Sequence, residues 1–333
     1  MHGEGLGSTW SVKLAGPLPA DLSAIQHGVQ ERIETIAHQL SRWDATSNLS
    51  LLNASPNEDW QSLPPELFSA LSSALSLAAD TGGAYDPTVA PLVDAWGFGT
   101  QGRRYAPPAP TDIAAARARV GWQRVELDAT NHRVRRPAGT QIDLSSMTHG
   151  FAADQVAAYL RSVGLQRHLV DVGSEIRASG NSPEGRPWRV AIERPPSESA
   201  DDSRIEHRAR ANGVSGSSAN TNATAAALRI VALSDEGIAT SGNYRYYFDY
   251  NGRRYSHRID PRTAEPITHP LASVTVIASA GLHADALATA LTVLGPEEGF
   301  EYARRHDIAA LFVVRTSDGF EQRMTPRFAR YLD

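Results

Sequence analysis

The chain contains no cysteine. This absence excludes disulfide bonds, thiolate metal sites and a cysteine nucleophile, and it leaves no cysteine to which a lipid could be attached. Proteins without cysteine occur in oxidising and in reducing compartments, so the absence does not locate this protein.

Long apolar runs and an excess of basic residues are also missing. No run approaches the ~20 apolar residues that a membrane-spanning helix needs. The N-terminal sequence MHGEGLGSTWSVKL lacks the basic and apolar regions of a signal peptide. We therefore expect either a cytoplasmic protein or one whose leader is not part of this sequence. The formal net charge of −5 and the lack of a long basic run argue against nucleic acid as a partner.

What the sequence does contain is typical of a large globular protein. Of its 333 residues, 41% are hydrophobic and 21% are charged, which is enough to form a large core. Helical periodicity and hairpin patterns are mixed along the chain, so we predict an α+β fold with mostly antiparallel sheet. We expect a single domain over residues 1–333. A segment at about residues 196–226 is poor in apolar residues and is predicted to be a mobile surface insertion.

The pattern of apolar residues, prolines and glycines predicts the individual elements. Helices are expected at 21–42, 64–81, 111–120, 150–163 and 281–295, with a further helix ending at 303–306. Strands are expected at 9–14, 168–172, 188–193, 228–234, 271–278 and 309–314, and hairpins at 125–135 and 241–261. Between the first two helices, SRWDATSNLSLLNAS is predicted to be a turn followed by a short apolar run.

The helix predicted at 281–295 carries Asp285 and Thr289, four residues apart. On a helix, this spacing places their oxygens on one face, about one turn apart. A carboxylate and a hydroxyl paired in this way can hold Mg²⁺, which prefers oxygen ligands. The alternative is an ordinary helix, in which Thr289 bonds back to the carbonyl of residue 285 and Asp285 is solvated.

The segment at 82–99, GGAYDPTVAPLVDAWGFG, combines glycines, prolines and aromatic residues. Glycines beside aromatic rings allow a backbone to approach a flat ligand closely. The alternative is a glycine- and proline-rich connector that covers the core.

Eight segments, in this order and spacing, resemble the ApbE family of FAD:protein FMN transferases. The resemblance runs from about residue 6 to residue 315, apart from the insertion. The segments are LGSTWSV at 6–12, SNLSLLN at 47–53, GGAYDPTVAPLVDAWGFG at 82–99, IDLSSMTHGFAAD at 142–154, LVDVGSEIRASG at 169–180, ATSGNYRYYF at 239–248, YSHRIDPRTAEP at 255–266 and ADALATAL at 284–291. Each is weak alone, and the ordered set is specific.

The resemblance implies an ApbE-like, T-fold-like architecture with a cleft for FAD between its sheets and helices. It implies a Mg²⁺-dependent enzyme that splits the diphosphate of FAD and moves FMN onto a Thr or Ser hydroxyl of an acceptor flavoprotein, leaving AMP. Members of the family are commonly exported or anchored by lipid toward the periplasm. Two other activities stay open: an FAD pyrophosphatase that gives FMN and AMP, and a non-catalytic FAD-binding protein.

The resemblance also implies the site residues. Mg²⁺ would be held by Asp285, Thr289 and the backbone carbonyl of Ser146. The residues implied to contact FAD are Leu6, Trp43, Ala84, Tyr85, Asp86, Asp143, His149, Ser241 and His257.

General chemistry suggests a role for some of these residues and an ordinary alternative for each. His257 titrates in the range of a base that could take the proton of the acceptor hydroxyl, or it could be a structural histidine of its hairpin. Asp143 could bind a polar edge of FAD or cap the turn at 145–146. Trp43 and Tyr85 could stack on flat rings or belong to the core.

The chain departs from the family pattern at three places. Leu6 replaces a common Met, a change of similar volume that we expect to be tolerated. Gly173-Ser174 replaces a more usual Gly-Gly. His149 replaces a Lys or Glu, and a histidine is less reliably charged at neutral pH. A contact between His149 and phosphate would therefore weaken as the pH rises.

Overall fold

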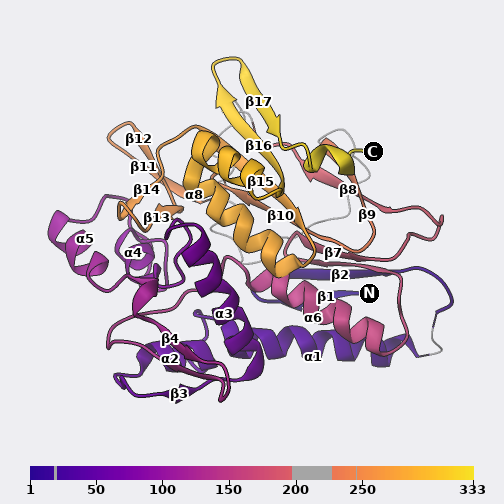
Figure 1. The fold of residues 1–333 in the computed structure, drawn as a ribbon, viewed down its shortest axis with the longest axis horizontal. Helices are drawn as coiled ribbons and strands as arrows, with labels where there is room; N and C mark the ends of the chain where they lie inside the picture. The colour runs from indigo at the N-terminus through magenta and orange to yellow at the C-terminus, as the bar shows by residue number, and fades with distance from the viewer. Residues whose placement is uncertain (19–20, 197–226, 245) are drawn as a thin grey trace.

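The computed structural model describes residues 1–18, 21–196, 227–244 and 246–333. Within them, the main sheet has eight strands in the order β1-β2-β6-β7-β10-β15-β16-β17, and all neighbouring pairs are antiparallel. This confirms the predicted α+β class with mostly antiparallel sheet (Figure 1). The strands are β1 (His2–Gly5), β2 (Ser8–Leu14), β6 (His168–Val172), β7 (Glu175–Ser179), β10 (Gly237–Gly242), β15 (Leu271–Ala278), β16 (Ala309–Thr316) and β17 (Gly319–Met324).

Helices cover one side of this sheet, and α1, α6 and α8 lie next to one another in that layer (Figure 1). The first of them begins as predicted, because the side chain of Asp21 accepts a hydrogen bond from the backbone N–H of Ala24 (3.0 Å). The helices are α1 (Leu22–Leu40), α2 (Asn48–Ala54), α3 (Pro65–Asp80), α4 (Ala90–Ala95), α5 (Pro110–Arg117), α6 (Thr148–Ser162) and α8 (Gly281–Arg305). Two short 3₁₀ helices, η1 and η2, span Trp122–Arg124 and Phe328–Tyr331.

The central strand β15 is buried on both faces, which explains its nearly continuous apolar sequence. On one face, Val274 and Val276 pack against α8. On the other face, Ile277 and Leu311 of the neighbouring strand belong to a cluster with β8 and β9. The main sheet therefore lies between a helical layer and a small second sheet.

The described residues also form four smaller sheets. The hairpin of β11 and β12 turns at Asn251 and Gly252, both with positive φ (49° and 75°), as the Asn-Gly pair predicts. The strands of these sheets are β8 (Trp188–Glu193) with β9 (Ala227–Leu233), β11 (Tyr247–Tyr250) with β12 (Arg253–Ser256), β13 (Ile259–Asp260) with β14 (Glu265–Pro266), and β3 (Gln61–Ser62), β5 (Arg133–Arg135) and β4 (Glu126–Asp128).

Helix α8 is fixed at its start by another helix. Its first N–H groups, on Gly281 and Leu282, donate to the carboxylate of Asp154 in α6 (2.8 and 2.9 Å). The two helices approach so closely that a Cβ on Gly150 would lie 2.2 Å from the carbonyl oxygen of Gly281. This contact fixes the position of the next turn of α8 relative to α6.

Some elements differ from the prediction. The apolar run expected at the end of SRWDATSNLSLLNAS is helix α2, which begins because Ser47 accepts a hydrogen bond from the N–H of Ser50 (3.0 Å). Helix α8 runs past Gly295, where φ is 85° and the chain bends before Pro296, so the two helices predicted there are nearly continuous. In the main sheet, strands β1, β7 and β17 and most of β10 were not predicted. The insertion predicted at about 196–226 lies almost wholly outside the described residues.

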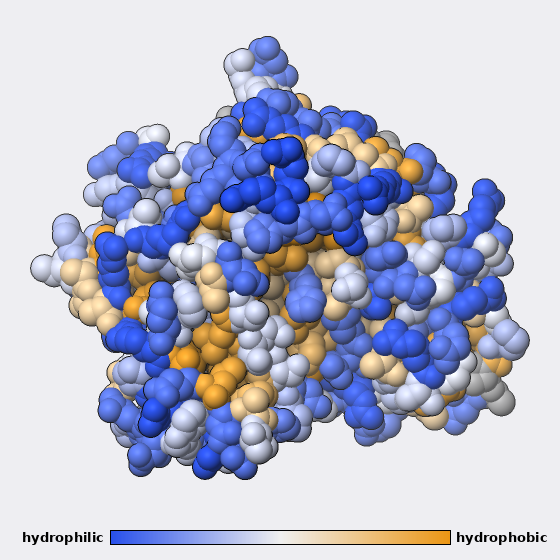
Figure 2. Space-filling view, in the orientation of Figure 1, coloured by the Kyte–Doolittle hydropathy of each residue, from blue (hydrophilic) through white to orange (hydrophobic). Residues whose placement is uncertain are grey.

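Hydrophilic residues cover most of the face drawn in Figure 2, and apolar residues reach the surface near its middle, over α3 and α8. Among the helices of the described residues, none is long and apolar enough to span a membrane.

Candidate functional site

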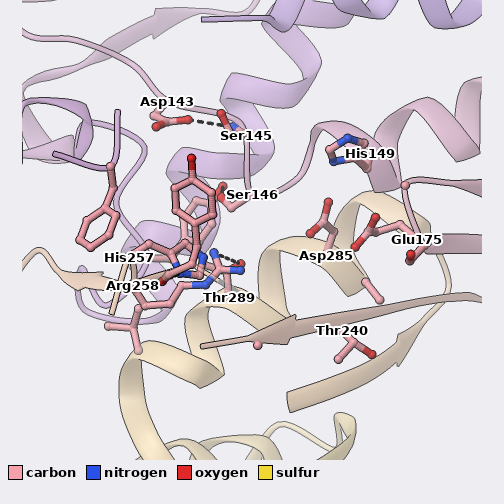
Figure 3. Close-up of a pocket in the computed structure, with 18 of the residues that line it drawn as sticks. Asp143, Ser145, Ser146, His149, Glu175, Thr240, His257, Arg258, Asp285 and Thr289 are labelled. Atoms are coloured by element: carbon pink, nitrogen blue, oxygen red, sulfur yellow. Dashed lines mark hydrogen bonds between the residues drawn. The ribbon is translucent and has the colours of Figure 1, made fainter. Parts of the chain in front are cut away.

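Segments that are far apart in the sequence meet around one cavity of about 870 Å³. This volume lies in the range of pockets that bind cofactors and other small molecules. Its walls come from the segment just after α1, the segment before α4, the turn before α6, the β6–β7 turn, and strands β8 and β10. The segment between β12 and β13 and one face of α8 complete it (Figure 3).

Asp285 lines this cavity from the second turn of α8. Its Oδ2 accepts a hydrogen bond from the N–H of Gly150 (3.2 Å), and no other hydrogen bond reaches the carboxylate from the described residues. The protein withdraws the group from water, and this raises its pKa to about 7; the Gly150 N–H and the charge of Arg258 offset only part of the effect. A carboxylate in this setting gains from a bound cation.

Thr289 lies one helical turn further along and also lines the cavity. Its Oγ1 accepts a hydrogen bond from Nη1 of Arg258 at 3.4 Å (Figure 3). Among the described hydrogen bonds there is none from Thr289 back to the carbonyl of residue 285. The two oxygens that the sequence places on one helical face therefore both point toward the cavity.

The turn before α6 brings a third oxygen. The N–H of Gly150 donates to Asp285, whereas in a regular helix it would donate to the carbonyl of Ser146. Within the described backbone contacts, this leaves the Ser146 carbonyl without a donor. The Ser146 hydroxyl itself donates to the phenolic oxygen of Tyr85 (3.0 Å). Burial raises the pKa of Tyr85, so its hydroxyl stays protonated.

These three oxygens fit the chemistry of Mg²⁺, which takes carboxylate, hydroxyl and carbonyl ligands. Among the described residues, no group of three or more His, Cys, Asp and Glu side chains could hold a metal ion. A cation beside Asp285 would therefore have at most two such side chains as ligands and would need further oxygens from Thr289, the Ser146 carbonyl, water or a bound phosphate.

Another side of the cavity is closed by a charged bridge that the sequence reading missed. Arg42 donates to Asp143 and to Asp94, each at 3.0 Å. The other carboxylate oxygen of Asp143 accepts from the N–H of Ser145 (2.9 Å). Asp143 thus caps its turn, the ordinary alternative considered for it, and it lines the cavity as well.

His257 lies in the cavity wall, edge-on to the rings of Phe98 and Tyr246. Its Nδ1 is 2.8 Å from the carbonyl of Tyr246, which can only accept, so Nδ1 carries the proton and Nε2 is the free acceptor. Burial first, and the charge of Arg258 second, lower the pKa of His257 to about 3. The histidine is therefore uncharged at neutral pH, and it also ties the ends of its hairpin together.

His149 is also uncharged, because burial lowers its pKa. Its Nε2 lies 3.3 Å from the carbonyl of Leu6, whose φ is +55°. Leu6 touches this cavity-lining histidine and is not itself among the residues that line the cavity. Gly173 lies against the ring, where a Cβ would come within 2.8 Å of it, and this explains a glycine at that turn.

Of the remaining predicted residues, all but one line the cavity. Ala84, Tyr85 and Asp86 line the cavity, and Trp43 lines its mouth with 65% of its surface exposed. Ser241 is not among the residues that line the cavity, and its contact with FAD stays a prediction. It is buried in β10, between the cavity-lining Thr240 and Gly242.

Five charged residues of the described wall were not predicted, namely Arg42, Asp171, Glu175, Glu193 and Arg258. Arg42 precedes the predicted Trp43, and Arg258 follows the predicted His257. A charged residue next to a predicted site residue was the signal that could have identified these two. In Figure 3, Asp285 lies between Glu175 and the pair formed by Arg258 and Thr289.

Comparison with known proteins gives the family. The family model described as the ApbE family matches residues 6–312. The FAD:protein FMN transferase of Klebsiella pneumoniae is 34% identical over 336 residues, covering 100% of this chain and 89% of that protein. The crystal structure of the Pseudomonas stutzeri flavinyl transferase ApbE, in its apo form, matches with a TM-score of 0.85 and 36% identity, covering 100% of this chain and 96% of that one. The flavin transferase ApbE from Vibrio cholerae matches with a TM-score of 0.84 and 32% identity, over 100% and 98%. The chain therefore belongs to the ApbE family.

Proposed function

We propose that this protein transfers FMN from FAD to a Thr or Ser hydroxyl of an acceptor flavoprotein and releases AMP. The observation that carries the proposal is the single cavity shared by Asp285, Thr289 and the turn at 143–149. These segments are distant in the sequence and all line a space large enough for a dinucleotide. Relatives that match the whole chain and are named FAD:protein FMN transferase support the same activity.

Magnesium is proposed as the metal, held by Asp285, Thr289 and the carbonyl of Ser146. When bound, it would neutralise negative charge on the phosphate oxygens of FAD. The fit rests on the half-buried carboxylate with its single hydrogen bond and on the carbonyl that the helix leaves without a donor.

In the reaction, the acceptor hydroxyl oxygen forms a bond to the phosphorus of the FMN half. The bond from that phosphorus to the AMP oxygen breaks, AMP leaves with that electron pair, and the hydroxyl proton must be accepted by a base. His257 is assigned this task because its Nε2 is the free acceptor of a ring that lines the cavity. Its pKa of about 3 makes it a weak base in the empty cavity, and the negative charge of a bound dinucleotide would raise that pKa.

The flavin half is assigned to the aromatic and turn residues of the cavity. Trp43 at the mouth offers an exposed ring face, and Ala84 and Tyr85 line the wall, where Tyr85 also belongs to the hydrophobic core. The carboxylate of Asp86 already accepts hydrogen bonds from Thr88 and from the N–H of Trp122. We therefore assign Asp86 the task of holding the turn that shapes this wall.

The experiment is intact-mass spectrometry of candidate acceptor proteins incubated with this protein, FAD and Mg²⁺. The proposal predicts that one acceptor gains the mass of FMN while AMP appears in equal amount. Free FMN formed at a comparable rate without any acceptor would instead indicate an FAD pyrophosphatase. Tight FAD binding without FMN or AMP formation, with each acceptor tried, would indicate a flavin-binding protein without this activity.

A further inference from the structure

Arg258 is held in a fixed position between two short strands. It lies between β12 and β13, and its backbone N–H donates to the hydroxyl of Ser256 (3.1 Å). Its carbonyl accepts from the N–H of Ile267 (2.9 Å). The backbone is therefore tied on both sides, and the side chain extends from it into the cavity wall (Figure 3).

The guanidinium group has little to bind within the protein. Its one hydrogen bond in the described part of the chain is the long contact of 3.4 Å to the hydroxyl of Thr289. Its Nε is enclosed and has no partner, and the described residues form no ion pair with it. An arginine offers five donors, and leaving enclosed donors unpaired is costly, so this arrangement favours an incoming acceptor.

The charges around the cavity make this arginine distinctive. The described lining residues include six carboxylates, namely Asp86, Asp143, Asp171, Glu175, Glu193 and Asp285, and two arginines. Arg42 is occupied by its bridge to Asp94 and Asp143. Within the described lining, Arg258 is therefore the arginine that forms no ion pair and could attract a ligand with negative charge.

We propose that Arg258 binds the diphosphate of the flavin dinucleotide directly, beside the proposed metal ligands Asp285 and Thr289. The inference rests on the proposed function, since it takes FAD as the ligand. Arginine suits the task because its planar fork of donors matches two phosphate oxygens at once. The competing explanation is that Arg258 only balances the negative charge of Asp285.

The test measures flavin binding without turnover, in EDTA and without an acceptor protein. Wild type, Arg258→Met and Arg258→Lys are titrated with FAD, riboflavin and adenosine, and binding is followed by flavin fluorescence, with adenosine as a competitor of FAD. Riboflavin and adenosine lack phosphate, so they report contacts to the two rings alone. The matched control is Arg253→Met, an exposed arginine on strand β12 that does not line the cavity. Thermal unfolding shows whether each variant is folded.

The proposal predicts that Arg258→Met weakens FAD binding by about tenfold to a hundredfold, the range of a charged hydrogen-bonding pair. Riboflavin and adenosine should bind the variant as they bind wild type, and Arg258→Lys should recover part of the loss because it keeps the charge. The control should bind all three ligands normally.

Two results would overturn the assignment of Arg258. One is a folded Arg258→Met protein that binds FAD as wild type does, which would leave Arg258 as a counter-ion of Asp285 and the proposed function intact. The other is an equal loss for FAD and riboflavin, which would indicate damage to the cavity wall. A wild-type protein that binds no FAD would refute the proposed function and this inference together.

Discussion

The two arginines of the cavity wall have opposite surroundings. Arg42 has 5% of its side chain exposed and bridges two carboxylates, each at 3.0 Å. Arg258 has one long hydrogen bond and, among the described residues, no ion pair. The Nε of each arginine is enclosed without a partner, so the difference lies in the ion pairs: Arg42 forms two, and Arg258 forms none with the described residues. A paired charge can hold the fold together, whereas an unpaired enclosed charge costs stability until a ligand arrives.

The carboxylates repeat this contrast. Both oxygens of Asp143 are engaged, by Arg42 and by the N–H of Ser145. Asp285 receives one backbone N–H, and its pKa is raised to about 7. The difference suggests that the Arg42 side of the cavity maintains the structure and the Arg258 side carries the chemistry.

The largest effect is expected for Asp285→Ala. This change removes the one carboxylate of the proposed metal site, and we expect FMN transfer to fall by about a thousandfold, or below detection. Transfer is measured as FMN mass gained by the acceptor over time. Glu301→Ala, at an exposed ion pair on the same helix, is the control and should keep full activity. Full activity in Asp285→Ala would refute the assignment of the metal to Asp285. It would also refute the proposed contrast between the two sides of the cavity.

On the other side of the cavity, Arg42→Gln should mainly affect stability. It leaves two largely buried carboxylates without their shared partner, and we expect the free energy of unfolding to fall by about 3–5 kcal/mol. Urea denaturation measures it. The control Arg304→Gln breaks an exposed pair and should cost about 0.5 kcal/mol or less. A loss as small as that of the control would show that the bridge is not structural.

The third prediction compares two isosteric changes, Asp285→Asn and Asp143→Asn, in metal-free protein. The folded pKa of Asp285 is raised from 3.8 to about 7, so the folded state holds the proton more tightly. The resulting penalty is absent below about pH 4, grows as the pH rises to 7 and is complete above it. Asp285→Asn should therefore stabilise the protein at pH 8, by about 2 kcal/mol once contact with water in the cavity is allowed for, and should have little effect at pH 4.

Asp143→Asn should do the opposite and destabilise the protein at pH 8, because it weakens the bridge to Arg42. Urea denaturation at pH 4 and pH 8 measures both variants. If both variants changed the free energy of unfolding in the same direction at pH 8, the distinction between the Arg42 side and the Arg258 side of the cavity would not hold.

The smallest effect is expected at the mouth of the cavity. Trp43→Ala removes an exposed ring that lines the opening, and we expect riboflavin and FAD to bind more weakly by a similar factor, about fivefold. Tyr105→Ala is matched to it, since Tyr105 is also 65% exposed and does not line the cavity. If Trp43→Ala bound both flavins with unchanged affinity, the flavin would not bind at the mouth of the cavity.

The sequence predicted what depends on local spacing. The four-residue interval between Asp285 and Thr289 placed both oxygens on one helical face, and Asn251-Gly252 identified its hairpin. It could not show that Arg42 would be occupied and Arg258 left unpaired, because that depends on partners about 50 to 100 and about 30 residues away, respectively.

A crystal structure of the protein with FAD and Mg²⁺ would locate both the diphosphate and the metal. We expect the diphosphate beside the guanidinium of Arg258 and the metal bound to Asp285 and Thr289. The bridge from Arg42 to Asp94 and Asp143 should be unchanged. A diphosphate bound to Arg42 with that bridge broken, or a metal away from Asp285, would contradict these expectations.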